Sequence, residues 1–377
     1  MENRVNDNIL EKIIRSQDEQ KKADLNPREL VDFLLKDLTQ REKDVLQSRY
    51  GILGEESQTL EQIGKRLNIT RERVRQIENN AIAKAKQSPD WKECLADLSS
   101  LIIKYINRHG YISSEVMLID EFLGEGAEQS AKNCLLFILE KFLVDQVEPV
   151  EIIQTEKAWK IKDKELKHYE QVVDGIKGIL MKKNEPLELV TIIQELEAEI
   201  NEEQRILMTE LESWESAVHS CLEVSKYFKK NLFDKWGMID WRSVNPKRMR
   251  DKIYLVLLKY GQPMHYRQIT EKINEESFDK KVAHPATVHN ELILDSRFVL
   301  VGRGIYALAE WGYKPGVISE VIVEILAKVG KPLTKKEIVE EVLKYRKVKE
   351  GSIGLTLSDK DIFQRTEAGE YTLRKQV

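Results

Sequence analysis

The chain has 377 residues, of which 41% are hydrophobic and 33% are charged, and its formal net charge is −4. This length suggests two to four domains, while the lack of an apolar run of about 18 residues and of a secretory signal pattern argues against a membrane-spanning or exported protein. The three scattered cysteines include no CxxC pair, so neither a disulfide framework nor a zinc site is indicated, and a reducing cytoplasm fits.

The N-terminal segment, residues 1–26, is predicted to hold one short amphipathic helix around Ile9–Ile14 and then a polar linker, Gln17–Asn26. The chain then enters a unit predicted to run from 27 to 90. Within it, residues 63–87 hold seven Lys or Arg and two Glu, a net charge of +5 (7 − 2). Such a segment can release counterions from DNA phosphates.

The second half of this unit has the pattern of a helix-turn-helix. Thr59 opens a helix and has Gln62 three residues later, which is the pattern of a capping box. Asn68 suits the left-handed backbone conformation of a tight turn. Thr70 is a good N-cap for a second helix.

In that second helix Val74 and Ile77 are spaced i and i+3, so they are expected to face the core. The polar residues near the helix N-terminus then point outward, and Arg and Gln in such places can read base edges in the major groove. The candidate DNA-contacting residues of this helix are Thr70, Arg71, Glu72, Arg73, Arg75, Gln76 and, farther along, Lys84.

The stretch from Leu38 to about Lys86 reads LTQREKDVLQSRYGI and then TLEQIGKRLNITRERVRQIENNAIAKAK, and it resembles region 4 of sigma-70-type bacterial sigma factors. In that family the unit binds the promoter −35 element through its second helix. The resemblance implies base or backbone contacts for Arg71, Glu72, Arg73 and Gln76, with Arg75 beside them. The alternative for these residues is a generic charged helix face. No counterpart of the promoter-melting region 2 is found, so the chain is not expected to start transcription alone.

The rest of the chain is predicted to be four tandem modules of about 65–75 residues. Val256–Ile269 aligns without gaps with Ile325–Ile338, and Ile179–Ile192 has a proline at the same place. Phe298–Leu308 and Phe363–Leu373 both read F-x5-G-x-Y-x-L, which predicts a β-hairpin around a glycine turn. Helices followed by a terminal hairpin are typical of a winged helix.

The predicted fold class is mainly α with small β-hairpin wings, a helix-turn-helix domain followed by tandem winged-helix modules. The predicted winged modules are 91–165, 166–243, 244–313 and 314–377. The second of these is acidic, since residues 185–223 hold eleven Glu and one Arg, a net charge of −10 (1 − 11). We expect this segment to face solvent or a basic protein surface, because DNA would repel it.

The third module, Arg248–Tyr313, resembles the HARE-HTH family, winged helices found in the delta subunit of bacterial RNA polymerase and in other chromatin- or DNA-associated proteins. Its ending, GRGIYALAEWGY, is the most specific part of that resemblance. The second helix of the turn is predicted at about Pro285–Ile293, with His289 and Asn290 as outward polar readers and Arg303 at the wing tip. In the alternative, the module binds protein and His289 only caps or packs.

No catalytic, cofactor-binding or metal-binding pattern is apparent. The six His residues form no HxxxH or HExxH, and the GRG at 302–304 is a hairpin turn rather than a phosphate loop. The chain is therefore predicted to be no enzyme and to need neither a cofactor nor a small-molecule ligand.

The predicted partners are promoter-like double-stranded DNA and the RNA polymerase core, at the nucleoid in the cytoplasm. The predicted function is sequence-specific DNA binding of the sigma region 4 kind, coupled to polymerase association in bacterial transcription initiation or its regulation. Two alternatives remain: a polymerase-associated protein whose modules bind protein, and a divergent sigma factor in which a winged module replaces region 2.

Overall fold

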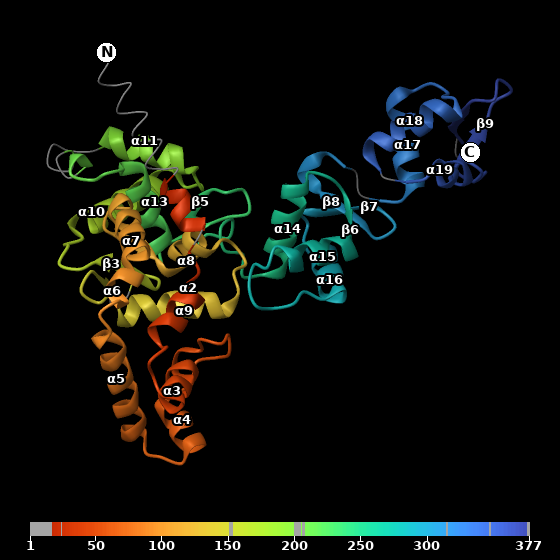
Figure 1. The fold of residues 1–377 in the computed structure, drawn as a ribbon. Helices are drawn as coiled ribbons and strands as arrows, with labels where there is room; N and C mark the ends of the chain where they lie inside the picture. Colours follow the sequence, from red (N-terminus) through yellow and green to blue (C-terminus); the bar gives the residue numbers. More distant parts are fainter. Residues whose placement is uncertain are drawn as a thin grey trace. The chain divides into compact units, whose positions relative to one another are not determined.

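The computed structural model divides into two compact units, Met1–Lys229 and Lys230–Val377, and each is described by itself (Figure 1). The structure describes residues 17–23, 25–150, 154–199, 205, 208–313, 316–346 and 348–374. The helix expected around Ile9–Ile14 lies outside the described residues. No described helix has both the length and the apolar character needed to cross a membrane.

Residues 17–23, predicted as part of a polar linker, are helical. Their charged side chains find partners in helices farther along the chain: Lys21 pairs with Asp97 at 2.6 Å and Lys22 with Glu121 at 2.7 Å. These partners lie 76 and 99 positions away in the sequence, so a local pattern does not reveal the contacts.

The helix-turn-helix part of the first unit consists of four helices, of which α3, α4 and α5 lie side by side (orange and red in Figure 1). Their bounds are α2 Pro27–Leu34, α3 Gln40–Tyr50, α4 Leu60–Leu67 and α5 Arg71–Gln87. A small core of its own holds α3, α4 and the first half of α5 together. Its buried side chains are Val45, Ile63, Val74 and Ile77.

The first winged module follows α5 and combines four helices, the first of them a single turn, with an antiparallel sheet of order β1-β3-β2. Its elements are α6 Trp91–Cys94, α7 Ala96–Arg108, β1 Ile112–Ser114, α8 Glu115–Leu123, α9 Gln129–Lys141, β2 Val147–Pro149 and β3 Ala158–Ile161. The sequence of helices and strands is that of a winged helix, as predicted.

The helix-turn-helix and this module share one hydrophobic core. Val31 of α2, Ala81 and Ala85 of α5 and Leu135 of α9 belong to the same buried cluster. α2 packs against α9, and Asn133 of α9 donates a 2.7 Å hydrogen bond to the Gly51 carbonyl. The second half of α5 is therefore buried against the next module. The hydrophobic core is continuous across residue 90, where the sequence suggested a domain boundary.

The second winged module is also packed onto the first. Its elements are α10 Lys167–Lys183, α11 Leu189–Glu199, α13 Trp214–Val224 and a hairpin of β4 Phe228–Lys230 and β5 Trp236–Met238. The Ser220 hydroxyl of α13 donates to the Ile112 carbonyl of β1, and the Glu156 amide donates to the Val224 carbonyl at 2.7 Å. A Cβ at Gly110 would lie 2.8 Å from that of Ala217, so α13 approaches the first module as closely as glycine permits.

The third module has the winged-helix order in full, with a sheet of order β6-β8-β7. Its elements are α14 Met249–Tyr260, β6 Met264–His265, α15 Tyr266–Glu275, α16 Pro285–Leu294, β7 Phe298–Gly302, β8 Ile305–Leu308 and the 3-10 turn η1 Ala309–Trp311. The predicted second helix is confirmed as α16, one residue longer than expected. An ion-pair cluster joins α14 to the start of the wing, where Arg297 contacts Asp251 at 3.1 Å and Asp295 at 2.8 Å.

The fourth module repeats this arrangement around a separate core. Its elements are α17 Ile318–Val329, α18 Lys335–Tyr345, α19 Glu350–Thr356, β9 Phe363–Arg365 and β10 Tyr371–Leu373. An isolated antiparallel β-bridge between Leu333 and Tyr371 takes the place of the first strand of the third module. The predicted fold class, mainly α with small hairpin wings, is therefore confirmed.

Candidate nucleic-acid interface

Local hydrogen bonds set the angle at which α5 leaves α4. Gln62 Oε1 accepts from the Thr59 amide at 2.8 Å, and Thr59 Oγ1 accepts from the Gln62 amide at 3.3 Å, so the predicted capping box is present. Asn68 takes the left-handed conformation with φ 52° and ψ 47°. Thr70 Oγ1 then accepts from the Arg73 amide at 3.2 Å and caps α5. Each of these residues plays the local structural role expected from the sequence.

The N-terminal half of α5 presents a polar face to solvent. Val74 is fully buried and Ile77 is 9% exposed, which holds one side of the helix against α3 and α4. The residues on the other side are exposed, and they are Arg71, Glu72, Arg73, Arg75 and Gln76. The structure thus brings these five predicted site residues together within the first two turns of one helix.

The charged side chains on this face differ in whether they already have a hydrogen-bond or ion-pair partner. Arg75 donates from Nε and Nη2 to the Glu72 carboxylate at 2.9 and 2.7 Å, and this pairing lowers the pKa of Glu72. Arg73 Nη1 donates to Gln76 Oε1 at 3.1 Å. Among the described residues, Arg71 has neither a hydrogen bond nor an ion pair. Arg71 is therefore the cation of this face that can bind an anion or a base without giving up a partner.

Glu78 is a residue whose role the sequence did not reveal. It follows the exposed face in sequence but is only 8% exposed. Its carboxylate accepts from the Tyr50 hydroxyl and lies 3.8 Å from Arg49 Nε. Burial and the nearby Glu78 carboxylate raise the pKa of Tyr50. Glu78 therefore anchors α5 to α3, and a Tyr and a Glu separated by 28 positions give no local signal of such a contact.

Lys84 lies farther along α5 and serves a different surface. It is exposed and stands 3.5 Å from Glu42 of α3. Thirteen residues separate it from Arg71, which at 1.5 Å per residue is about 20 Å of helix. Lys84 therefore lies on a part of α5 well separated from the exposed residues near Thr70.

The corresponding helix of the third module, α16, differs from α5 in charge. α16, PATVHNELIL, contains no Lys or Arg. His289 is half-buried and stacks on Tyr266 with ring centroids 4.7 Å apart, and its other ring neighbour is Tyr306 at 5.9 Å. These ring contacts agree with the alternative interpretation, in which His289 packs within the module. Asn290 and Arg303 are exposed, as expected.

Two comparisons with known families match these two regions. Residues 34–87 match the family described as Sigma-70, region 4. Residues 248–311 match the HARE-HTH family, whose description includes a restriction endonuclease HTH domain. Both resemblances expected from the sequence are confirmed.

Several individual relatives are bacterial sigma factors, and each matches a short part of this chain. The RNA polymerase sigma factor RpoD of Helicobacter pylori (strain ATCC 700392 / 26695) is 46% identical over 84 residues, which are 22% of this chain and 12% of that protein. The sigma factor SigA4 of Synechococcus elongatus is 47% identical over 58 residues, 15% and 19% of the two chains. SigA of Lactococcus lactis subsp. cremoris is 46% identical over 59 residues, 16% of each. The chain thus spans less than a fifth of the length of these relatives.

Within the described ranges no group of three or more His, Cys, Asp or Glu side chains is arranged to hold a metal ion. The three cysteines are free thiols, and burial raises the pKa of Cys134 to about 11. At neutral pH this thiol is therefore protonated and a poor nucleophile.

Proposed function

We propose that the chain binds promoter-like double-stranded DNA through α4 and α5, with α5 in the major groove, and that it acts in bacterial transcription in association with RNA polymerase. One observation carries this proposal: the Thr70 cap and the buried Val74 and Ile77 hold α5 so that its first two turns expose a set of Arg and Gln side chains. The match of residues 34–87 to sigma-70 region 4 supports it.

The contacts differ in kind along the helix. Arg71 has the geometry of a base reader, since an Arg fork suits the O6 and N7 acceptors of guanine. Arg73 and Gln76, already joined by a hydrogen bond, form a second reading group. The pair of Arg75 and Glu72 is close to neutral and contributes selectivity more than affinity. Lys84 adds a phosphate contact.

The arrangement of the first unit favours DNA over protein as the partner of α5. The apolar sides of α2 and of the second half of α5 are covered by α9 and its neighbours. A protein helix that docked there would have to displace α9. The exposed surface that remains at the turn is polar and basic, which suits a phosphate backbone.

The polymerase association is proposed for the winged modules. Protein contact suits the third module, because α16 lacks cations and exposes Ile293 and Leu294 at 62% and 80%. The acidic second module is a further candidate surface. Its Glu195 and Glu199 pair with Lys183 and Lys182. The acidic residues open to a partner are Glu185, Glu197, Glu210, Glu212 and Glu215.

Selection of binding sites from random duplex DNA, followed by titration at several salt concentrations, tests the proposal. We expect an enriched sequence and, for about five to seven phosphate contacts, a slope of log K against log salt near −5 to −6. Duplex without the enriched sequence serves as the control and should bind more weakly. Recovery of no preferred sequence would contradict the proposal.

A further inference from the structure

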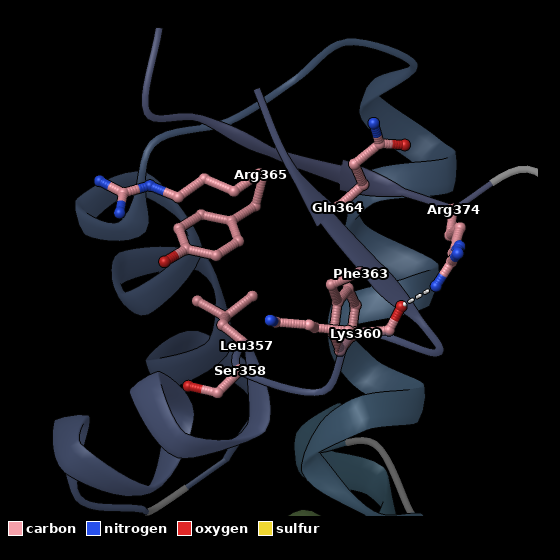
Figure 2. A pocket seen from close by; sticks show the side chains of 8 residues that line it. Leu357, Ser358, Lys360, Phe363, Gln364, Arg365 and Arg374 are labelled. Carbon is pink, nitrogen blue, oxygen red and sulfur yellow. Dashed lines mark hydrogen bonds between the residues drawn. The ribbon is translucent and has the colours of Figure 1, made fainter. Parts of the chain in front are cut away.

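A second site of a different kind lies in the fourth module, where a cavity of about 570 Å³ opens between the end of α19 and the hairpin of β9 and β10 (Figure 2). Its apolar floor is made by Leu357 and Phe363, which are 4% and 3% exposed. Tyr371, which is half-buried, forms a wall. The volume is within the range of about 300–1,000 Å³ that is usual for small-molecule sites.

The charged residues that line this cavity are all cations. Lys360, Arg365 and Arg374 line it, and no Asp or Glu does. Figure 2 shows the Lys360 ammonium pointing toward Leu357, while the Arg365 side chain extends outward with its guanidinium directed away from Lys360. Arg374 Nη1 donates to the Lys360 carbonyl at 2.7 Å, which ties the end of the hairpin to the loop that carries Lys360. In the part of the chain that the structure describes, neither Lys360 nor Arg365 has a carboxylate partner.

The third module lacks these three cations, although Lys230 of the second module stands at the place of Arg365, 5.4 Å from the Trp236 ring. The hairpins of the third and fourth modules match at an offset of 65 (363 − 298), from Phe298 and Phe363. At the places of Lys360, Arg365 and Arg374 the third module has Asp295, Leu300 and Ala309. The shared wing architecture therefore does not require the cations, and one of them stands where the third module has the opposite charge.

An aromatic wall beside the cations adds a preference for a flat ring. The Arg365 guanidinium carbon lies 5.9 Å from the centroid of the Tyr371 ring. This separation is too short for a planar group to enter between the two, so a flat ring would gain stacking stabilisation against the Tyr371 ring itself. Lys and Arg together are the usual partners of phosphate oxygens in proteins.

We propose that this cavity, the wing pocket of the fourth module, binds a free nucleoside phosphate. The phosphates lie against Lys360 and Arg365, and the base lies against Tyr371 above the apolar floor. This site goes beyond DNA binding by α5 and does not rest on it, and the sequence patterns gave no sign of it. A transcription protein with such a site responds to the nucleotide level of the cell.

Calorimetric titration of the full chain with ATP and with GTP tests this site. We expect saturable binding that the double variant Lys360→Ala/Arg365→Ala weakens by about tenfold or more, since it removes both cations that would contact the phosphates. Lys328→Ala, which removes an exposed cation of α17 outside the pocket, is the matched control and should bind as the wild type does. Arg71→Ala should also leave nucleotide binding unchanged, which separates this site from the proposed DNA-binding site.

Tyr371→Leu tests the part of the proposal that concerns the base. We expect it to weaken ATP binding several-fold and to leave the binding of inorganic tripolyphosphate unchanged. Thermal melting of every variant reports whether the module still folds. The proposal is overturned if neither nucleotide binds saturably, if tripolyphosphate binds as tightly as ATP to the wild type, or if the double variant loses affinity only for duplex DNA.

Discussion

The exposed residues of α5 are expected to contribute unequally to DNA recognition, because some of them already have hydrogen-bond partners within the helix. Arg75 and Glu72 satisfy each other, and Arg73 is held by Gln76. Arg71 has no such partner among the described residues and stands one position after the Thr70 cap. At the N-terminus of a helix the backbone amides also favour an anion. Arg71 should therefore contribute most to sequence preference.

Arg71→Ala should cost about 1–3 kcal/mol of specific DNA binding and relax the sequence preference at one base pair. Lys84→Ala, which removes a cation some 20 Å along the helix, should weaken binding to all sequences about equally. Fluorescence anisotropy on the selected site and on single-base variants of that site measures both effects. Unchanged affinity and preference in Arg71→Ala would rule out α5 as the reader.

At the scale of elements, the third module shows how a wing is held to its helices. His265, Tyr266, His289 and Tyr306 form a continuous series of ring contacts that runs from the start of α15 through α16 to β8. The wing turn closes on the first of these rings, because a Cβ at Gly304 would lie 2.7 Å from His265 Nε2. His289 is thus part of the packing that positions the wing.

Gly304→Ala should therefore destabilise the third module more than a turn glycine substitution ordinarily does. Gly304 has φ +69°, which alone costs an L-residue about 1–2 kcal/mol, and the methyl group would also push His265 away. Gly312→Ala is the matched control, since Gly312 has φ +79° but nothing within 4 Å of the added Cβ. Hydrogen exchange of residues 264–308 should rise more in Gly304→Ala. Equal exchange in the two variants would show that the ring contact is dispensable.

At the scale of the whole molecule, the first unit is held together by contacts between modules. His168 of α10 is 6% exposed and faces Gly110 and Tyr111 of the first module, with a ring distance of 6.2 Å to Tyr111. Burial lowers the pKa of His168, with a smaller opposing contribution from a hydrogen bond to the Gly110 backbone. The neutral imidazole is therefore the form that the folded unit accepts.

This burial predicts that the first unit loses stability as pH falls. The unfolded chain takes up a proton near the ordinary histidine pKa of about 6.5, whereas folded His168 does so only at lower pH. Unfolding thus binds a proton, and the stabilisation present above that pKa is lost below it. His109 is also half-buried and its pKa is lowered by burial. Both histidines should therefore contribute to the loss of stability at low pH. Thermal midpoints at several pH values should fall less steeply in His168→Gln, and an unchanged slope would contradict this account.

The acidic surface of the second module offers a test of polymerase association. Reversing Glu210, Glu212 and Glu215 to Lys should lower recovery of polymerase core in a pull-down and raise non-specific DNA affinity. A cluster is needed because a single exposed pair contributes only about 0–1 kcal/mol, and the effect should shrink with added salt.

Reversal of Glu195 and Glu199 is the matched control for this surface. Both carboxylates are already paired within the module, with Lys183 and Lys182. Glu202 and Glu203 of the same acidic segment lie outside the described residues. Equal recovery of polymerase by the wild type and the triple variant at low salt would leave the acidic surface with no role beyond solubility.

The sequence by itself determined the helix-turn-helix and the repeated winged modules. Capping by Thr59 and Thr70 and the turn at Asn68 depend on residues within four positions of each other, so a local pattern predicts them. The exposed face of α5 followed from the i, i+3 spacing of two buried residues. The matched hairpins of the third and fourth modules likewise reflect a period that is visible in the chain itself.

Only the tertiary structure decided which polar residues have partners and which surfaces are covered. Glu78 is buried and accepts a hydrogen bond from Tyr50, His289 packs against the rings of Tyr266 and Tyr306, and α9 covers the base of the helix-turn-helix. Each of these features depends on residues distant in sequence, whose contact is set by packing and not by local periodicity.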